Sequence, residues 1–145
     1  MKKVEASIEV EASPQQAMDA FILPEHLKGW WGVERSFIEV KAGGLYSLAW
    51  QISDAGIKYI STGVIKEYQP KSKLVIEKWV YFNPERPILG PLELSFVVEP
   101  IGKNSKISVC QAGYQEGEHW QWYYEAVVEA WPAVLKQLKK YLEQK

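Results

Sequence analysis

Residues 118–145, EHWQWYYEAVVEAWPAVLKQLKKYLEQK, carry the longest regular pattern in the chain. Apolar side chains recur there at steps of four and three, at Trp120, Tyr124, Val128, Trp131, Leu135, Leu138 and Leu142. That spacing is the period of an α-helix with one apolar face, and such a face needs another surface to cover it. Because most of the preceding sequence alternates like β-strands, the pattern predicts a long C-terminal helix that packs on a sheet.

The interior of this helix holds a proline and an uneven distribution of aromatic residues. Pro132 removes one backbone hydrogen bond, which predicts a bend near 128–132 or two segments that meet there. The aromatic side chains concentrate before Pro132, and the apolar residues after it are mainly aliphatic. Two interpretations follow: the aromatic half either caps a solid core or roofs a cavity.

Working back toward the N-terminus, the chain reads as an α+β protein. Residues 4–11 alternate as a half-buried strand, Ser13 and Pro14 begin a short helix, and 24–27 form a second helical turn that ends near Gly29. Six more strands are predicted at 37–40, 45–52, 58–68, 74–82, 92–99 and 106–113. Short turns between the strands indicate a curved antiparallel sheet wrapped around the C-terminal helix, in one domain over residues 1–145.

Composition excludes several classes of function. The 145 residues are 47% apolar and carry a net charge of −1, which argues against nucleic-acid binding. Cys110 is the single cysteine, so no intramolecular disulfide is possible and a reducing compartment is expected. No apolar run approaches the ~20 residues of a membrane span and no signal peptide is evident, so we expect a cytoplasmic protein.

The sequence offers few groups for catalysis or metal binding. His26 and His119 are the two histidines, and neither has the spacing of a metal site. There is no nucleophile motif and no phosphate- or dinucleotide-binding fingerprint. We therefore expect no catalytic residues, no metal and no cofactor.

Several short motifs resemble a known superfamily. They are Ala12-Ser13-Pro14, residues 24–27 followed by Trp30-Trp31, residues 43–46, residues 63–70, and Trp131-Pro132. In this order they resemble the START-like, or SRPBCC, superfamily with its helix-grip fold (also called Bet v-like), and within it the homologues of the activator of heat-shock protein 90 ATPase. The resemblance implies a cavity between sheet and C-terminal helix, where members bind lipids, polyketides, aromatic metabolites or hormones.

Seven Trp and eight Tyr supply the main functional candidates, because ligand pockets are mostly apolar and aromatic. Gln111 adds a polar group on an otherwise apolar strand face. The predicted ligand-binding residues are Trp31, Tyr46, Trp50, Trp79, Tyr81, Phe96, Gln111, Trp120 and Tyr124. The leading hypothesis is a cavity that binds a small hydrophobic, aromatic or lipid-like molecule.

Two alternatives stay open. One is a chaperone-associated interaction module, monomeric or homodimeric, that uses an outer surface such as the loop 83–91. The other is a cavity enzyme with Glu77 as general base, which requires Glu77 to share an inward face with Trp79 and Tyr81. For Glu77, as for Glu67, an ordinary solvated carboxylate is the favoured interpretation.

Overall fold

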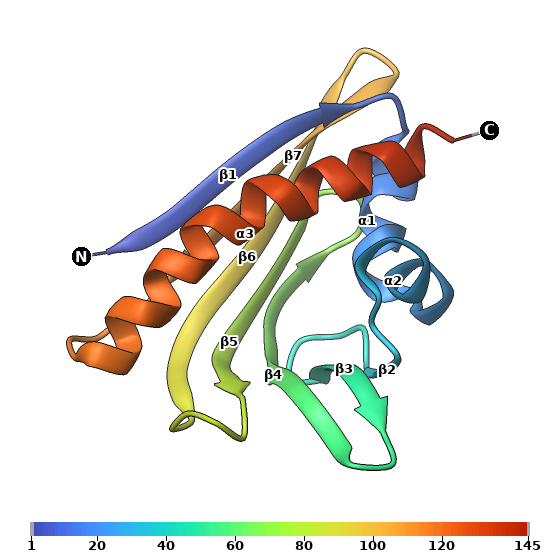
Figure 1. Cartoon of the computed structure of the whole chain (residues 1–145). Helices are drawn as coiled ribbons and strands as arrows, with labels where there is room; N and C mark the ends of the chain where they lie inside the picture. The colour runs from blue at the N-terminus through green and yellow to red at the C-terminus, as the bar shows by residue number, and fades with distance from the viewer. Residues whose placement is uncertain (1, 145) are drawn as a thin grey trace.

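A computed structural model describes residues 2–144, and its elements follow the predicted order (Figure 1). They are β1 (Lys3–Val10), α1 (Pro14–Ile22), α2 (Pro24–Trp31), β2 (Arg35–Ile38), β3 (Leu45–Ser53), β4 (Gly56–Gln69), β5 (Lys73–Phe82), β6 (Leu89–Ile101), β7 (Asn104–Ala112) and α3 (Glu118–Leu142).

All seven strands form one antiparallel sheet in the order β1-β7-β6-β5-β4-β3-β2. The sheet curves around α3, which crosses its inner face, while α1 and α2 lie near the C-terminal end of α3 (Figure 1). The predicted α+β helix-grip fold is confirmed.

Polar contacts at both ends fix α3 alongside β1. Near its start, Lys2 Nζ donates a hydrogen bond to Gln121 Oε1 at 2.6 Å. Near its end, Glu143 Oε2 accepts from the Glu11 backbone N at 2.8 Å. The helix therefore runs in the same direction as β1, and its two halves lie over different parts of the sheet.

Capping residues set the ends of the two short helices. Ser13 and Gln16 form a reciprocal capping box at the start of α1, as predicted. The second helix extends past the expected end near Gly29 and stops at Trp31, because Gly32 takes a left-handed conformation with φ 73°. At the other end of the fold, His26 Nδ1 lies 2.7 Å from Tyr141 Oη and so connects α2 to α3.

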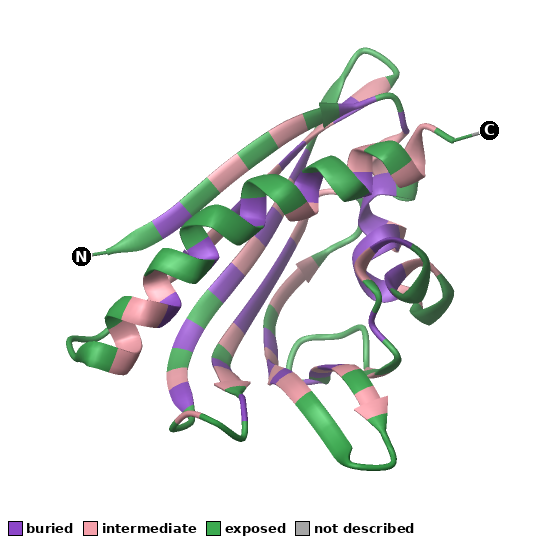
Figure 2. Ribbon diagram, viewed as in Figure 1, coloured by how far each residue is buried: buried purple, intermediate pink, exposed green. Residues whose placement is uncertain are grey.

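The buried apolar residues form one cluster between the sheet and the three helices (Figure 2). Tyr46, Phe21 and Phe96 are its largest fully buried side chains. These three residues contact one another. The Tyr46 hydroxyl donates a hydrogen bond to the Phe21 carbonyl at 2.6 Å, and the Phe21 and Phe96 rings stack with centroids 4.2 Å apart.

The apolar face of α3 is rotated relative to the prediction. Tyr123, Val127 and Trp131 are buried there, whereas Val128 is 42% exposed and Tyr124 is only half-buried. Aromatic side chains at 122, 123 and 124 point in three successive directions around the helix, so periodicity alone could not select the inward one. The helix is continuous through Pro132, so the predicted alternative of two segments is wrong.

Several strand ends differ from the sequence-based bounds. The strand expected at 37–40 is β2 at Arg35–Ile38, because Arg35 to Ile38 pair with Ala49 to Tyr46 of β3. The loop expected at 83–91 ends earlier, since β6 already begins at Leu89.

A β-bulge in β5 reverses the faces of that strand. Lys78 has φ 54°, and the register to both neighbouring strands shifts beside it. The bulge lies against Gly63 of β4, where a Cβ atom would come within 2.7 Å of the Glu77 carbonyl oxygen. The sequence prediction that Gly63 marks a bulge or close approach is confirmed.

Candidate functional site

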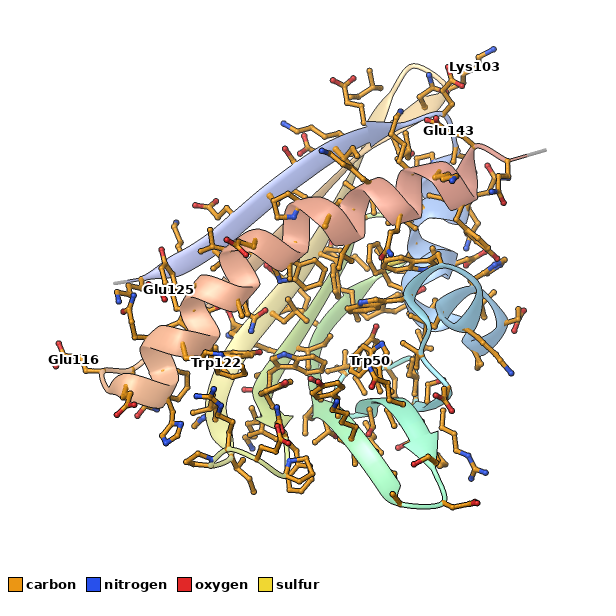
Figure 3. The ribbon with its side chains drawn as sticks, in the orientation of Figure 1. Trp50, Lys103, Glu116, Trp122, Glu125 and Glu143 are labelled. Atoms are coloured by element: carbon orange, nitrogen blue, oxygen red, sulfur yellow. The ribbon has the colours of Figure 1, made fainter. Side chains whose placement is uncertain are left out.

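A pocket of about 390 Å³ lies between the N-terminal half of α3 and strands β3 to β5. Its lining consists of aromatic, small apolar and neutral polar side chains: Trp31, Trp50, Tyr59, Ser61, Trp79, Tyr81, Asn83, Gln111, Trp122, Tyr123, Ala126, Val127, Ala130, Trp131 and Val134. Eight of these fifteen described residues are aromatic, and none carries a formal charge. Trp122 on α3 and Trp50 on β3 lie on opposite sides of the space beneath the helix (Figure 3).

Five of the nine sequence-predicted residues line this pocket: Trp31, Trp50, Trp79, Tyr81 and Gln111. The Trp31 ring stacks at 5.0 Å on the buried Trp30 ring, whose Nε1 donates to the Ala20 carbonyl at 2.8 Å. The Trp50 indole is held by a hydrogen bond from Nε1 to the Trp31 carbonyl at 3.1 Å.

The other four predicted residues lie outside the pocket. Tyr46 and Phe96 are fully buried in the core. Trp120 and Tyr124 surround Tyr114 instead, with ring centroids 6.3 and 5.1 Å from the Tyr114 ring.

Gln111 connects β7 to α3 at the inner wall of the pocket. Its Nε2 donates to the Tyr123 hydroxyl at 2.9 Å, and its Oε1 accepts from Trp131 Nε1 at 3.1 Å. Gln111 is only 2% exposed, so these hydrogen bonds satisfy groups that are largely shielded from water. Burial raises the pKa of the Tyr123 hydroxyl, against a smaller lowering from the Gln111 hydrogen bond, so Tyr123 stays protonated at neutral pH.

Further polar groups on the pocket wall keep hydrogen-bonding capacity. Ser61 lies on the pocket wall, is 5% exposed, and carries a hydroxyl that can donate and accept hydrogen bonds. The Tyr81 hydroxyl accepts a long hydrogen bond, 3.4 Å, from Asn83 Nδ2. A ligand with oxygen acceptors would therefore meet hydroxyl donors within an otherwise apolar surface.

The exposed side of the pocket was not anticipated. Trp122, Ala126, Ala130 and Val134 follow one another at steps of four along α3 and line the opening, where both alanines are exposed. A large aromatic residue followed by small residues along one helical row is the signal that sequence reasoning could have used.

Tyr114, on the connection between β7 and α3, holds a polar atom without a partner. Its hydroxyl oxygen is buried and makes no hydrogen bond within the described chain. Burial is the main cause that raises the pKa of this phenol. The arrangement is energetically unfavourable in the structure as it stands.

The cavity-enzyme hypothesis does not meet its geometric condition. Ile65 and Ile76, paired across β4 and β5, are fully buried, and the next pair, Val64 with Glu77, faces the opposite side of the sheet. On that outer side Glu77 and Glu67 contribute to the raised pKa of the exposed Lys66, whose main partner is Glu93. The bulge at Lys78 separates Glu77 from Trp79 and Tyr81, so the prediction that these residues share a face is wrong.

Within residues 2–144, no three His, Cys, Asp or Glu side chains gather as metal ligands would. None of the described helices is both long and apolar enough to cross a membrane.

The curved sheet, the two short helices and the long C-terminal helix over an aromatic pocket define a START-like, or SRPBCC, domain. Residues 11–143 match the family described as activator of Hsp90 ATPase homolog 1-like protein, and the chain belongs to that family. No curated protein matches the sequence.

Solved structures share the fold at low sequence identity. Protein CV1439 from Chromobacterium violaceum is 18% identical over 100% of both chains, with a TM-score of 0.76. The Aha1 dimer from Colwellia psychrerythraea is 18% identical over 99% of this chain and 97% of that one, with a TM-score of 0.72. Protein MLL2253 from Mesorhizobium loti is 13% identical over 98% and 97%, with a TM-score of 0.77.

Proposed function

We propose that this protein binds a small hydrophobic molecule, aromatic or lipid-like, in the pocket beneath the N-terminal half of α3. The observation that carries the proposal is an uncharged lining in which eight of fifteen residues are aromatic. Apolar contact with Trp and Tyr rings supplies the affinity, and hydroxyl groups such as Ser61 orient the bound molecule. The pocket volume of about 390 Å³ lies within the usual range for small-molecule sites.

The test is a titration with N-phenyl-1-naphthylamine, a neutral dye that fluoresces in apolar surroundings. Energy transfer from tryptophan reports binding, and we expect one saturable site. Trp50→Ala removes a ring from the pocket wall and should weaken binding about tenfold. Trp120→Ala is the matched control, because Trp120 is also half-buried but does not line the pocket.

Native folding of each variant is checked by circular dichroism and thermal unfolding. Absence of saturable binding by the folded wild-type protein contradicts the proposal. Equal losses in Trp50→Ala and Trp120→Ala also contradict it, because they would place the dye elsewhere.

A second candidate is a protein-interaction module of the kind that the family name describes. Ile88 favours it: this residue follows the turn between β5 and β6 and is 63% exposed, beside the 37% exposed Phe82. We would measure ATP hydrolysis by a purified Hsp90-type chaperone with and without this protein. Ile101→Ser is the control, because Ile101 is 43% exposed at the opposite end of β6. Stimulation that Ile88→Ser abolishes and Ile101→Ser preserves would support the module, and an unchanged ATPase rate would contradict it.

A further inference from the structure

The pocket is uncharged along its lining, but a cation lies beside its rim. Arg86, in the loop between β5 and β6, places its guanidinium 3.8 Å from the centre of the Trp122 ring, and Trp122 lines the pocket. The loop holds this position because the Arg86 backbone N donates to the Asn83 carbonyl at 2.9 Å and Asn83 is itself buried on the pocket wall.

Arg86 has no carboxylate partner in the described part of the chain. No ion pair to the Arg86 guanidinium occurs within 4.0 Å among residues 2–144, although several lysines pair with glutamates there. Its Nη1 lies 3.5 Å from His119 Nδ1, a long contact to a group that carries no negative charge. A guanidinium stacked on an indole keeps its in-plane N–H groups available to an acceptor, so Arg86 has unused capacity for an anion.

The charge of Arg86 reaches the pocket wall. Burial raises the pKa of the Tyr81 hydroxyl, while the hydrogen bond from Asn83 and the positive charge of Arg86 both lower it. Aromatic boxes without charge also suit organic cations, but a cation entering here would meet a like charge at the rim and no carboxylate on the lining. The arrangement favours a negatively charged group at that end.

We propose that the pocket takes a flat aromatic acid, with its ring system between the sheet and α3 and its acidic group at the rim, where the Arg86 guanidinium donates hydrogen bonds to it. This inference rests on the proposed function and narrows its ligand class. Carboxylate and sulfonate share the chemistry that Arg86 recognises, which is a delocalised oxyanion able to accept two parallel N–H bonds.

A matched pair of dyes tests the inference. The probes are 1-anilinonaphthalene-8-sulfonate and N-phenyl-1-naphthylamine, which share one ring system and differ by the sulfonate. Arg86→Gln should weaken binding of the sulfonate about tenfold, as expected for loss of a hydrogen bond to a charged group. It should change the affinity for the neutral dye by less than about twofold, since the apolar lining is retained. Raising the salt concentration should weaken binding of the sulfonate alone.

Two further variants separate charge from structure. Arg35→Gln removes the other arginine of the chain, which is exposed on β2, and should leave both dyes unaffected. Arg86→Lys keeps the charge but not the planar fork, so it should retain part of the affinity for the sulfonate.

The outcomes distinguish this inference from the function beneath it. If both dyes bind the wild type and Arg86→Gln weakens both affinities equally, or neither, the aromatic-acid proposal is overturned. The proposal that the pocket binds a hydrophobic molecule would still stand. If neither dye binds the folded wild type, both the proposed pocket function and the aromatic-acid proposal are overturned.

Discussion

The two halves of α3 perform different tasks on the same sheet. The C-terminal half buries Leu135 and Leu138 completely against the core formed with α1 and α2. The N-terminal half buries Tyr123, Val127 and Trp131, and each of these also lines the pocket. One half of the helix thus completes a packed interior, while the other covers a space.

The side chains differ accordingly. Leucine has no polar atom, so the C-terminal half needs only a close fit. Tyr123 and Trp131 carry polar groups that must find partners when buried, and Gln111 supplies both. We call Gln111 and its hydrogen bonds to Tyr123 and Trp131 the polar clip. Such directional bonds can hold a helix above a pocket, whereas apolar packing alone would favour closing the pocket.

The largest expected effect comes from cutting one aliphatic side chain in each half. Leu135→Ala should lower the free energy of unfolding by about 3 kcal/mol, because it leaves a cavity in a fully buried site. Val127→Ala should cost only about 1 kcal/mol, because its side chain already borders open space. Urea unfolding at fixed pH measures both values.

Equal costs, after allowance for the extra carbon atom of leucine, would contradict the comparison and indicate that the N-terminal half is packed as tightly as the other. The neutral dye gives a second readout: Val127→Ala should alter dye affinity, while Leu135→Ala should leave it unchanged in the folded protein.

The next effect concerns the polar clip. Gln111→Leu keeps a similar volume but removes the partners of the Tyr123 hydroxyl and the Trp131 indole N–H, so unfolding should require about 2 kcal/mol less. Gln137→Leu is the control, because Gln137 is exposed on the same helix. A Gln111→Leu variant as stable as wild type would show that packing alone holds the N-terminal half.

The sequence predicted the position of Gln111 because β7 alternates without interruption. Ile107, Val109 and Gln111 must share a face, and all three are buried. The same reasoning failed on β5, where the bulge at Lys78 reverses the alternation. Nothing in the local pattern of β5 marks that bulge, although Gly63 on the partner strand did signal a close approach.

On α3 the period predicted a helix but could not orient it. Three adjacent aromatic residues give several faces of similar apolarity, and only the contacts with Gln111 and the sheet select Tyr123. Tyr59, Trp122 and Asn83 were missed for a related reason, because they reach the pocket from a hairpin, a helix flank and a loop. Only the tertiary arrangement brings these three together.

A smaller effect distinguishes two buried tyrosine hydroxyls. Tyr114→Phe should raise the free energy of unfolding by about 1 kcal/mol, because it removes a buried hydroxyl without a partner beside the N-terminal half of α3. Tyr46→Phe should lower it by about 1 kcal/mol, because the Phe21 carbonyl in the core loses its donor. Thermal and urea unfolding would give the two signs, and destabilisation by Tyr114→Phe would reveal a partner for that hydroxyl.

The smallest effect lies at the far end of the C-terminal half, where Glu143 ties α3 to the end of β1. The hydrogen bond from Lys139, followed by that from the Glu11 backbone N, lowers the pKa of the Glu143 carboxyl below its ordinary value of 4.5. A depressed pKa in the folded state means that the ionised carboxylate stabilises the protein. This contribution is complete above pH 4.5 and is lost as the pH falls through the lower, folded-state pKa.

Glu143→Gln should therefore be slightly less stable than wild type at pH 7, and the difference should shrink as the solution is acidified below pH 4.5. Glu129→Gln is the control, because Glu129 is exposed on the same helix and forms no ion pair among the described residues. Urea unfolding at pH 7 and at pH 3 gives the comparison. If Glu143→Gln is still less stable than wild type by the same amount at pH 3, the charge on Glu143 is not what holds this end of α3. The geometry of the hydrogen bond from the Glu11 backbone N would then be responsible.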